Sequence, residues 1–532
     1  MSYPRHLQTL IVEDEQEPIE NYRNLFEEFA KKGLNVAPPV FARSHDDAIK
    51  LLSTSSIFHL VIVDLGLPNT AHEPALAGVE LGIHIVQQAA ARDEYPIPAL
   101  LVISGRLGQA HLSALTDSLK RDFWHGDMVN KGDMDLDEAI ACAVRKAQDY
   151  CDVGIHLRDV SDKLCPTLSP REDDLLRRCV LTQPLCIGLD LEWWGVSKGY
   201  SFSPPSAATG MTKVLMGRFL LRDGKESSRP SFFKFEAKER ATCSHQAVAV
   251  LVQKLSHVKL CSAMISLSRG LLVTQQVGGS SARPISLAEL LGGASEKADV
   301  AIPRIVSDIV GQLGNLGTAT EDRFAVSTLL WQWHDLEKIK AACLRHGGDL
   351  GSRAIQLLEK LRVSNKELWV NRQSCTHGDL NATNIAIEVV EDGYRAYIFD
   401  AEGIQADTAI RDLAMLETTL LLHQRNLPPG MSLVEECKAV YATGVSVPKL
   451  VPTENPPLVQ NSLKLIREIR HHVLQKDQIQ PYALMVFDCA MLQLGGLAVQ
   501  SRGNRIANPQ DAVRLAELAA SWLVSLAPEI TA

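Results

Sequence analysis

One stretch decides the fold of the carboxyl-terminal part of the chain: Cys375-Thr376-His377-Gly378-Asp379-Leu380-Asn381-Ala382-Thr383-Asn384-Ile385. A strand-like run follows it and ends at Asp400, sixteen residues after Asn384. Transfer of a phosphoryl group needs a carboxylate near the attacking hydroxyl, and an amide oxygen and a second carboxylate that hold magnesium. Asp379 suits the first role as a catalytic residue, and Asn384 and Asp400 suit the second as metal ligands.

With the motif His377-Gly378-Asp379, the stretch resembles the aminoglycoside phosphotransferase branch of the kinase-like fold, where His-Gly-Asp stands in place of His-Arg-Asp. Arg411-Asp412-Leu413-Ala414 is similar to the sequence that opens a helix behind the metal loop in that branch. The resemblance implies a bilobal kinase-like α+β domain over residues 185–532, with ATP and Mg²⁺ as cofactors. The structural alternative is an ordinary turn entering a helix, with Asp400 an ordinary acid at a strand end.

The region before this stretch is expected to be a small, sheet-rich lobe. Strand-like runs cover 185–191, 213–221, 231–235 and 271–277. Lys234 lies within the third run, where the resemblance implies a lysine that pairs with nucleotide phosphates; the alternative is a surface lysine. Gly199 and Ser201 lie in the expected phosphate-covering loop, although no clean Gly-x-Gly-x-x-Gly is present.

Helical periodicity dominates the rest of the carboxyl-terminal part, so the large lobe is expected to be mostly helical. The predicted helices cover 305–313, 325–339, 413–422, 481–499 and 511–526. Trp331, Trp333 and Trp369 are interpreted as core aromatics.

The first 150 residues repeat a different pattern, in which a short apolar run ends in polar residues and leads into a helix. The runs at 9–12, 60–63 and 99–103 are uninterrupted, as is typical of strands buried on both faces of a parallel sheet. The helix after the first run carries Ile19, Tyr22, Phe26 and Phe29 and stops at Gly33. This part is therefore predicted to be a doubly wound α/β domain.

The carboxyl ends of parallel strands form the site in such a domain. The residues expected to converge there are Glu13, Asp14, Asp64, Ser104 and Lys131. Clustered carboxylates bind Mg²⁺, and Asp64 is placed as a nucleophile that accepts a phosphoryl group. Ser104 is expected to hydrogen-bond that group, and Lys131 to pair with its charge.

With these five positions, residues 1–150 resemble the receiver domain of bacterial two-component response regulators, a (βα)₅ fold. The resemblance implies phosphorylation of Asp64, with Glu13, Asp14 and Asp64 as metal ligands. The chain departs from the family in three places. Val129 stands where many receivers have an aromatic residue, Gly132 replaces the usual proline after the lysine, and 69–78 looks like an insertion beside Asp64.

Residues 151–184 are predicted to be a helical connector. Ser169-Pro170-Arg171-Glu172 has the pattern of a helix start with a capping box. The connector either carries a signal between the two domains or serves as a plain spacer, and the sequence favours neither.

Composition limits the classes of protein and partner. The net charge is −9, 46% of residues are hydrophobic, and there is no long basic run, so nucleic acid is not expected as a partner. Eleven cysteines occur singly without Cys-x-x-Cys, as suits reduced thiols. With neither a signal-peptide pattern nor an apolar stretch of about 18 residues, we expect a cytoplasmic protein without membrane association.

The sequence thus predicts a response regulator in which a receiver phosphorylated on Asp64 controls an ATP- and Mg²⁺-dependent phosphotransferase. Its expected partners are an upstream histidine kinase or small phosphodonor, and an unknown hydroxyl substrate or protein. Two alternatives remain: a pseudokinase that binds without catalysis, and an interaction platform assembled by phosphorylation as a homodimer.

Overall fold

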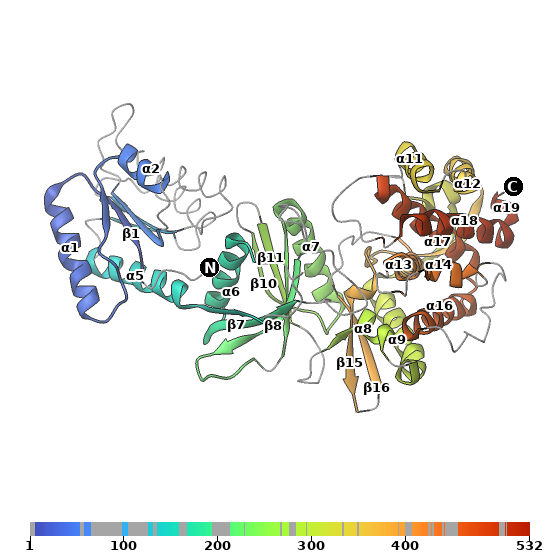
Figure 1. Ribbon diagram of the computed structural model, residues 1–532, viewed down its shortest axis with the longest axis horizontal. Coiled ribbons are helices and arrows are strands. Elements are labelled where there is room, and N and C mark those ends of the chain that lie inside the picture. Colours follow the sequence, from blue (N-terminus) through green and yellow to red (C-terminus); the bar gives the residue numbers. More distant parts are fainter. Residues whose placement is uncertain are drawn as a thin grey trace.

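The computed structural model describes most of the chain in separate ranges, and structural statements below concern those ranges alone. They are 6–53, 58–64, 98–104, 126–130, 136–158, 168–193, 213–227, 229–265, 269–275, 284–293, 295–331, 335–347, 350–391, 393–399, 407–423, 427, 430–438, 441, 456–498, 506 and 508–531. Figure 1 shows a sheet with its helices at one end of the molecule, a second sheet in the middle and a helix-rich part at the other end.

The amino-terminal part is a five-stranded parallel sheet with strand order β2-β1-β3-β4-β5. Its elements are β1 (Thr9–Val12), α1 (Gln16–Lys31), β2 (Val40–Ala42), α2 (His45–Ser53), β3 (Leu60–Asp64), β4 (Ala99–Ser104), β5 (Gly126–Asn130) and α5 (Leu136–Asp152). Helix α2 packs on one face, and α1 and α5 pack on the other. The predicted doubly wound α/β architecture is therefore confirmed for this part.

The strand sequences explain this packing, because successive side chains of a strand point to opposite faces. Leu10 of β1 and Val61 of β3 pack with the α2 side, whereas Ile11 and Ile62 pack with α1 and α5. Both faces are covered, so an unbroken apolar run is required rather than an alternating one. Helix α1 ends as predicted, with Gly33 in the left-handed region at φ 88°.

The expected helical connector contains a strand as well as a helix. Strand β6 (Gly154–Leu157) begins two residues after α5 ends and pairs in parallel with β7 (Cys186–Trp193). Helix α6 (Pro170–Thr182) begins with the predicted capping box of Ser169 and Glu172. The segment is thus built into the next sheet, because β6 satisfies the backbone edge of β7.

The middle part is a six-stranded sheet with order β10-β11-β9-β8-β7-β6. Its other elements are β8 (Lys213–Leu221), β9 (Ser231–Ala237), α7 (Lys238–Lys254), β10 (Lys259–Ile265) and β11 (Arg269–Gln275). One face packs on α6 through Phe233 and Phe235 of β9. The other face carries Phe232, Lys234 and Glu236, since residues two apart in a strand share a face.

The carboxyl-terminal part is mostly helical, as predicted, with two small antiparallel sheets of order β12-β15-β16 and β13-β14. Its elements are β12 (Ile285–Ser286), α8 (Leu287–Gly292), α9 (Ser295–Leu316), β13 (Ala319–Ala325), α10 (Val326–Leu329), α11 (Leu336–Gly347), α12 (Ser352–Arg362), β14 (Glu367–Gln373), η2 (Ala382–Asn384), β15 (Ile385–Val390), β16 (Gly393–Ile398), α13 (Ala409–Leu422), α14 (Leu433–Glu436), α16 (Pro457–Gln475), α17 (Ile479–Ala498), α18 (Pro509–Leu526) and α19 (Pro528–Thr531).

A buried ionic cluster fixes helix α13 within this part. The carboxylate of Glu417 pairs with Arg470 of α16 and accepts hydrogen bonds from the hydroxyls of Tyr441 and Tyr482, at 2.6 and 2.8 Å. The guanidinium of Arg470 lies over the ring of Trp522 in α18, 4.1 Å from its centroid. Because a buried charge requires a paired and hydrogen-bonded environment, the cluster specifies how these helices meet.

Two predictions about the carboxyl-terminal part are wrong. A single helix over 325–339 is replaced by the end of β13, the four-residue α10 and the start of α11 at Leu336, because the chain leaves the helix at Leu330. Trp369 is 51% exposed rather than a core residue, and the guanidinium of Arg323 lies over its ring. Trp333 lies outside the described residues. Within those residues, no helix has the length and apolarity needed to span a bilayer.

Candidate functional site

The loop between β14 and β15 brings Asp379 and Asn384 together. The Nδ2 group of Asn384 donates a hydrogen bond to the backbone carbonyl of Asp379 at 2.9 Å and lies 3.5 Å from its Oδ2 atom. Asn384 closes the short helix η2, and its side chain is buried. Its amide nitrogen therefore points at Asp379 and its amide oxygen points away, where it accepts a long hydrogen bond from the hydroxyl of Thr383 at 3.5 Å.

His377 connects this loop to the strand end before Asp400. Its Nε2 atom is 2.9 Å from the backbone carbonyl of Phe399, and a carbonyl only accepts, so Nε2–H is the donor. Its Nδ1 atom accepts the backbone N–H of Asp379 at 3.4 Å. Phe399 in turn donates its N–H to the carbonyl of Asn384 at 3.0 Å. The loop and the end of β16 are thus held in one arrangement; Asp400 itself lies outside the described residues.

Asp412, in the first turn of α13, hydrogen-bonds to the backbone of the loop that carries Asp379. Its two carboxylate oxygens accept the backbone N–H groups of His377 and Gly378 at 2.9 and 2.8 Å. Gly378 has φ 81°, a conformation that suits glycine. Complete burial raises the pKa of Asp412, and His377 and these N–H groups partly offset the effect. The structure thus gives the predicted Arg-Asp-Leu-Ala sequence a positioning role.

Arg411 anchors the same helix start to more distant parts of the chain. Its guanidinium pairs with Asp488 of α17 and with Asp407, and donates to the carbonyl of Leu329. It also lies over the ring of Trp331, 4.9 Å from the centroid. Asp488 was not among the predicted site residues, because it is 77 residues from Arg411 and its local sequence is an ordinary apolar helix.

Lys234 is buried in β9, with 4% exposure, which excludes a surface lysine. Its Nζ atom pairs with Glu236 of the same strand at 3.0 Å. Arg240, in the first turn of α7, also reaches Glu236, at 3.3 Å. Burial of a charge is costly unless it is paired, so Glu236 compensates the buried ammonium of Lys234 and holds it in place. Spacing alone could have identified this partner, since the two residues share one face of a strand.

The face of β9 that carries Lys234 lies against the hairpin that follows the loop. Phe232 of β9 and Met216 of β8 pack on Ala386 of β15, and the ring of Phe399 completes this cluster. The six-stranded sheet and the loop of Asp379 therefore meet across this contact.

The amino-terminal sheet carries a second candidate site. Glu13 and Asp64, both buried, follow β1 and end β3 at the carboxyl ends of neighbouring parallel strands. Burial raises the pKa of Tyr22 in α1, and the charges of Glu13 and Asp64 raise it further, which indicates that these carboxylates lie near its hydroxyl. Tyr22 was predicted only as a core residue.

The structure describes only part of the site that the sequence predicts for a receiver. The Oε1 atom of Glu13 accepts the backbone N–H of Glu15 at 3.2 Å, which turns its carboxylate toward the start of α1. Among the described residues, no three histidine, cysteine, aspartate or glutamate side chains gather as a metal-binding group, and the assignment of Glu13, Asp14 and Asp64 as metal ligands stays a prediction. Ser104 ends β4, but its side chain lies outside the described part, as do Lys131, Gly199 and Ser201.

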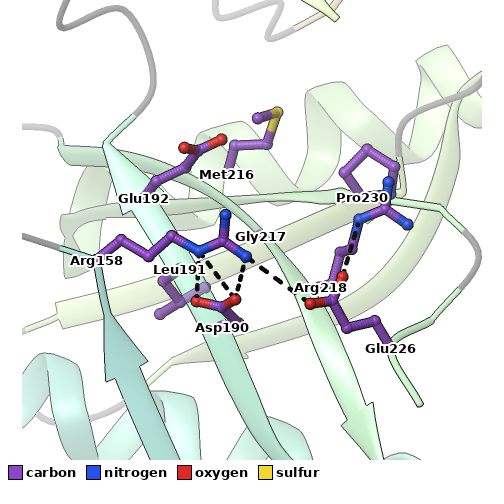
Figure 2. A pocket seen from close by; sticks show the side chains of 9 residues that line it. All are labelled: Arg158, Asp190, Leu191, Glu192, Met216, Gly217, Arg218, Glu226 and Pro230. Atoms are coloured by element: carbon purple, nitrogen blue, oxygen red, sulfur yellow. Dashed lines mark hydrogen bonds and ion pairs between the residues drawn. The ribbon is translucent and has the colours of Figure 1, made fainter. Parts of the chain in front are cut away.

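A pocket of about 240 Å³ lies on the six-stranded sheet, at the edge where β6 joins it. Figure 2 shows that charged pairs surround it: Arg158 binds Asp190 through both Nε and Nη2 and reaches Glu226, which also pairs with Arg218. None of the predicted site residues lines it. These ion pairs join Arg158, which follows β6, to Asp190 of β7 and, through Glu226, to Arg218 of β8.

Comparisons with known proteins give little further information. No protein-family model matches the chain, and no curated protein does. Among solved structures, the chain is similar to a Ralstonia eutropha JMP134 protein provisionally classed as an aminoglycoside phosphotransferase, with 12% identity, a TM-score of 0.32, and coverage of 60% of this chain and 94% of that one.

Two further solved structures are similar at the same level. A microcompartment-associated aminopropanol kinase has 11% identity, a TM-score of 0.30, and coverage of 65% of this chain and 94% of that one. WbdD, solved with the kinase inhibitor LY294002, has 14% identity, a TM-score of 0.18, and coverage of 77% of this chain and 83% of that one. Similarity at TM-scores this low supports no conclusion about function. The function proposed for this chain therefore rests on the geometry of the two sites.

Proposed function

We propose that residues 185–532 form a kinase-like phosphotransferase that acts on a hydroxyl. The observation that carries this proposal is the contact of Asn384 with Asp379, in a loop that Asp412 and His377 hold rigid. Such a loop positions a carboxylate and an amide oxygen at a fixed separation, as phosphoryl transfer requires. A scaffold has no chemical need for this arrangement.

Each residue then has a distinct role. Asp379 orients the acceptor hydroxyl and takes up its proton. Asn384 and Asp400 would hold Mg²⁺, and Lys234, with Gly199 and Ser201 from the covering loop, would hold the phosphates of ATP. Asn384 supports this assignment, because its amide oxygen is turned away from Asp379 and oxygen is the ligand that Mg²⁺ prefers. When bound, ATP supplies the phosphoryl group and Mg²⁺ offsets its negative charge.

We further propose that residues 1–150 are a receiver domain that controls this activity. The strand order β2-β1-β3-β4-β5 and the positions of Glu13 and Asp64 support the proposal. Asp64 would accept a phosphoryl group from a histidine kinase or a small phosphodonor, Ser104 and Lys131 would contact that group, and Glu13, Asp14 and Asp64 would hold Mg²⁺. Binding of the ion requires the carboxylate of Glu13 to turn away from Glu15.

Calorimetry of ATP binding to the full chain, with and without Mg²⁺, tests the phosphotransferase proposal. We expect weak binding without the metal, tighter binding with it, and loss of that difference in Asn384→Ala and Asp400→Ala. Asn371→Ala, on β14 outside the loop, is the matched control. Binding of equal strength with chelator and with Mg²⁺ would show that Asn384 and Asp400 hold no metal.

Intact-mass spectrometry tests the receiver proposal. Incubation with acetyl phosphate and Mg²⁺ is expected to add about 80 Da to the native protein in a form labile to hydroxylamine, as an aspartyl phosphate is. Asp64→Asn should gain nothing, whereas Asp47→Asn, an exposed acid of α2, should label normally. Equal labelling of the native protein and Asp64→Asn would exclude Asp64 as the acceptor.

A further inference from the structure

Phe232 connects the six-stranded sheet to the catalytic loop through a stacked aromatic pair. Its ring lies parallel to that of Phe399, with 4.6 Å between centroids and 14° between planes. Phe232 is 4% exposed, and Met216 and Ala386 pack around it. The pair thus fills the space between β9 and the hairpin β15-β16 at this point.

The backbone of Phe399 is fixed by hydrogen bonds on both sides. Its N–H donates to the carbonyl of Asn384, and its carbonyl accepts from His377. The backbone of Phe232 is fixed as well, because β9 is paired with β8 on one side and with β11 on the other. The two rings can therefore separate only by rotation of a side chain, and Phe232 is the ring that shares its strand face with Lys234.

The position of this pair along β9 relates it to the proposed nucleotide site. Phe232 and Lys234 share one face, and two residues of a strand span about 6.6 Å. A nucleotide is longer than this, so the ring of Phe232 lies within reach of one whose phosphates are at Lys234. In the other direction the same face carries Glu236, which pairs with Lys234 and Arg240, and such a charged surface offers a planar base no apolar side chain to pack on.

The strand register also places the base on the Phe232 side of Lys234. Phe232 pairs with Thr274 of β11, next to Gln275, where the chain leaves the sheet. A nucleotide with its phosphates at Lys234 would therefore place its base at Phe232, between the sheet and Ala386.

We infer that Phe232 occupies the nucleobase subsite, so that a nucleotide must displace it from Phe399 to bind. This inference rests on the proposed phosphotransferase function and deepens it, since it makes Phe232 a residue that limits nucleotide affinity. The opposite role, a platform on which the base stacks, needs an exposed ring face. Phe232 has none, because one face lies on Phe399 and the side chain is buried.

Two probes separate the base from the phosphates: Mg²⁺-ATP, and Mg²⁺ with inorganic tripolyphosphate, which has no base. For Phe232→Ala in the full chain we expect about tenfold tighter binding of ATP, equivalent to about 1.4 kcal/mol. Tripolyphosphate should bind equally to both proteins. N6-benzyl-ATP, whose base is too large for the native subsite, should bind to the variant alone.

Phe219→Ala is the matched control. Phe219 is a buried phenylalanine of the same sheet, but it packs on the opposite face, against Phe233. It tests whether loosening the sheet is enough to increase affinity, and we expect it to leave ATP binding unchanged. Phe232→Leu, which preserves more of the packing, is expected to tighten ATP binding about threefold and remains informative if the alanine variant fails to fold.

Calorimetry with these proteins gives clear outcomes. Tighter ATP binding in the Phe232 variants, with unchanged tripolyphosphate binding, supports the inference. Unchanged or weaker ATP binding in Phe232→Ala overturns it while the native protein still binds ATP, and weaker binding would identify Phe232 as a stacking platform. If no protein binds either ligand, the proposed phosphotransferase function fails, and the inference fails with it.

Discussion

The carboxylate of Asp412 accepts the backbone N–H of Gly378 at 2.8 Å, across 34 residues of sequence. Its other oxygen accepts the N–H of His377, so one buried side chain fixes two successive peptides of the loop that carries Asp379. The position of Asp379 thus depends on where α13 begins, and α13 is itself anchored through Arg411 and Glu417.

Asp412→Ala is expected to destabilise the protein by about 2–4 kcal/mol, because two hydrogen bonds to a buried charged group contribute about 1.5–3 kcal/mol each and removal of the cost of burying the carboxylate offsets part of their loss. Turnover should fall further than stability explains, since Asp379 loses its fixed position. Urea unfolding and ATP turnover measure the two effects. Asp322→Ala, an exposed acid of β13, serves as control. A variant that is destabilised but turns over normally below its unfolding transition would contradict the positioning role.

Glu236→Gln should weaken the alignment of Lys234 without removing its charge. We expect KM for Mg²⁺-ATP to rise about tenfold with a smaller change in kcat, as suits a residue that positions a group contacting the phosphates. Steady-state kinetics checks this split, with the exposed Glu239→Gln in the same region as control. Glu236→Asp should restore part of the loss. Equal kinetics for Glu236→Gln and Glu239→Gln would mean that another group positions Lys234.

The strongest sequence predictions concern segments whose burial is determined locally. The apolar run Leu60–Val63 predicted a strand because both of its faces are covered, and the spacing of Tyr22, Phe26 and Phe29 predicted the buried face of α1. Strand β6 was missed because an edge strand of four partly exposed residues shows no clear alternation. The break at Leu330 was missed because apolar periodicity continues through a bend in the backbone.

The site was predictable only where its chemistry lies in contiguous residues. Asp379 and Asn384 lie five residues apart, and the structure places them in contact. The contact of Arg411 with Asp488 and that of Tyr150 with Asp174 join distant segments with no local signal. Phe232 was missed because a phenylalanine in an apolar strand looks like any core residue until its partner Phe399 is known.

Arg177 offers a test of communication between the two domains. It donates hydrogen bonds to the carbonyls of Tyr150, Cys151 and Val153 at the end of α5, although it belongs to α6. If the proposed receiver controls the phosphotransferase, phosphorylation should change ATP turnover several-fold, since a few new charge-assisted bonds fall short of the roughly 5.5 kcal/mol that a complete switch needs.

Arg177→Gln is expected to abolish that several-fold response to acetyl phosphate while leaving basal turnover within about twofold, because α5 no longer moves with α6. The measurement compares turnover with and without phosphodonor. Arg145→Gln, on the exposed side of α5, should respond as the native protein does. A full response in Arg177→Gln would show that the signal travels by another route.

His59 gives the amino-terminal part a defined pH dependence. Burial, with a smaller effect of the charge of Arg177, lowers its pKa from 6.5 to about 4. Its Nδ1 atom accepts the backbone N–H of Gln8 at 3.0 Å, which also requires an unprotonated nitrogen. The unfolded chain binds a proton near pH 6.5 and the folded one does not. The stabilisation is therefore present above pH 6.5 and is lost as the pH falls toward 4.

The loss at pH 5 is about 2 kcal/mol, from 1.5 pH units at about 1.36 kcal/mol each. Urea unfolding at pH 7.5 and pH 5 should show this difference between the native protein and His59→Asn, in which the amide oxygen still accepts from Gln8 but does not titrate. An identical pH dependence of the two proteins would show that His59 is not the responsible group.

The most direct test of the central claim is transfer of label from γ-labelled ATP to an acceptor in cell extract, with the native chain compared with Asp379→Ala. We predict that the native protein labels at least one acceptor in the presence of Mg²⁺. The variant should still bind Mg²⁺-ATP but transfer at least about 100-fold less, the typical contribution of a catalytic base. If both proteins transfer label equally, or if the native protein binds Mg²⁺-ATP and transfers nothing, Asp379 is not the centre of a phosphotransferase.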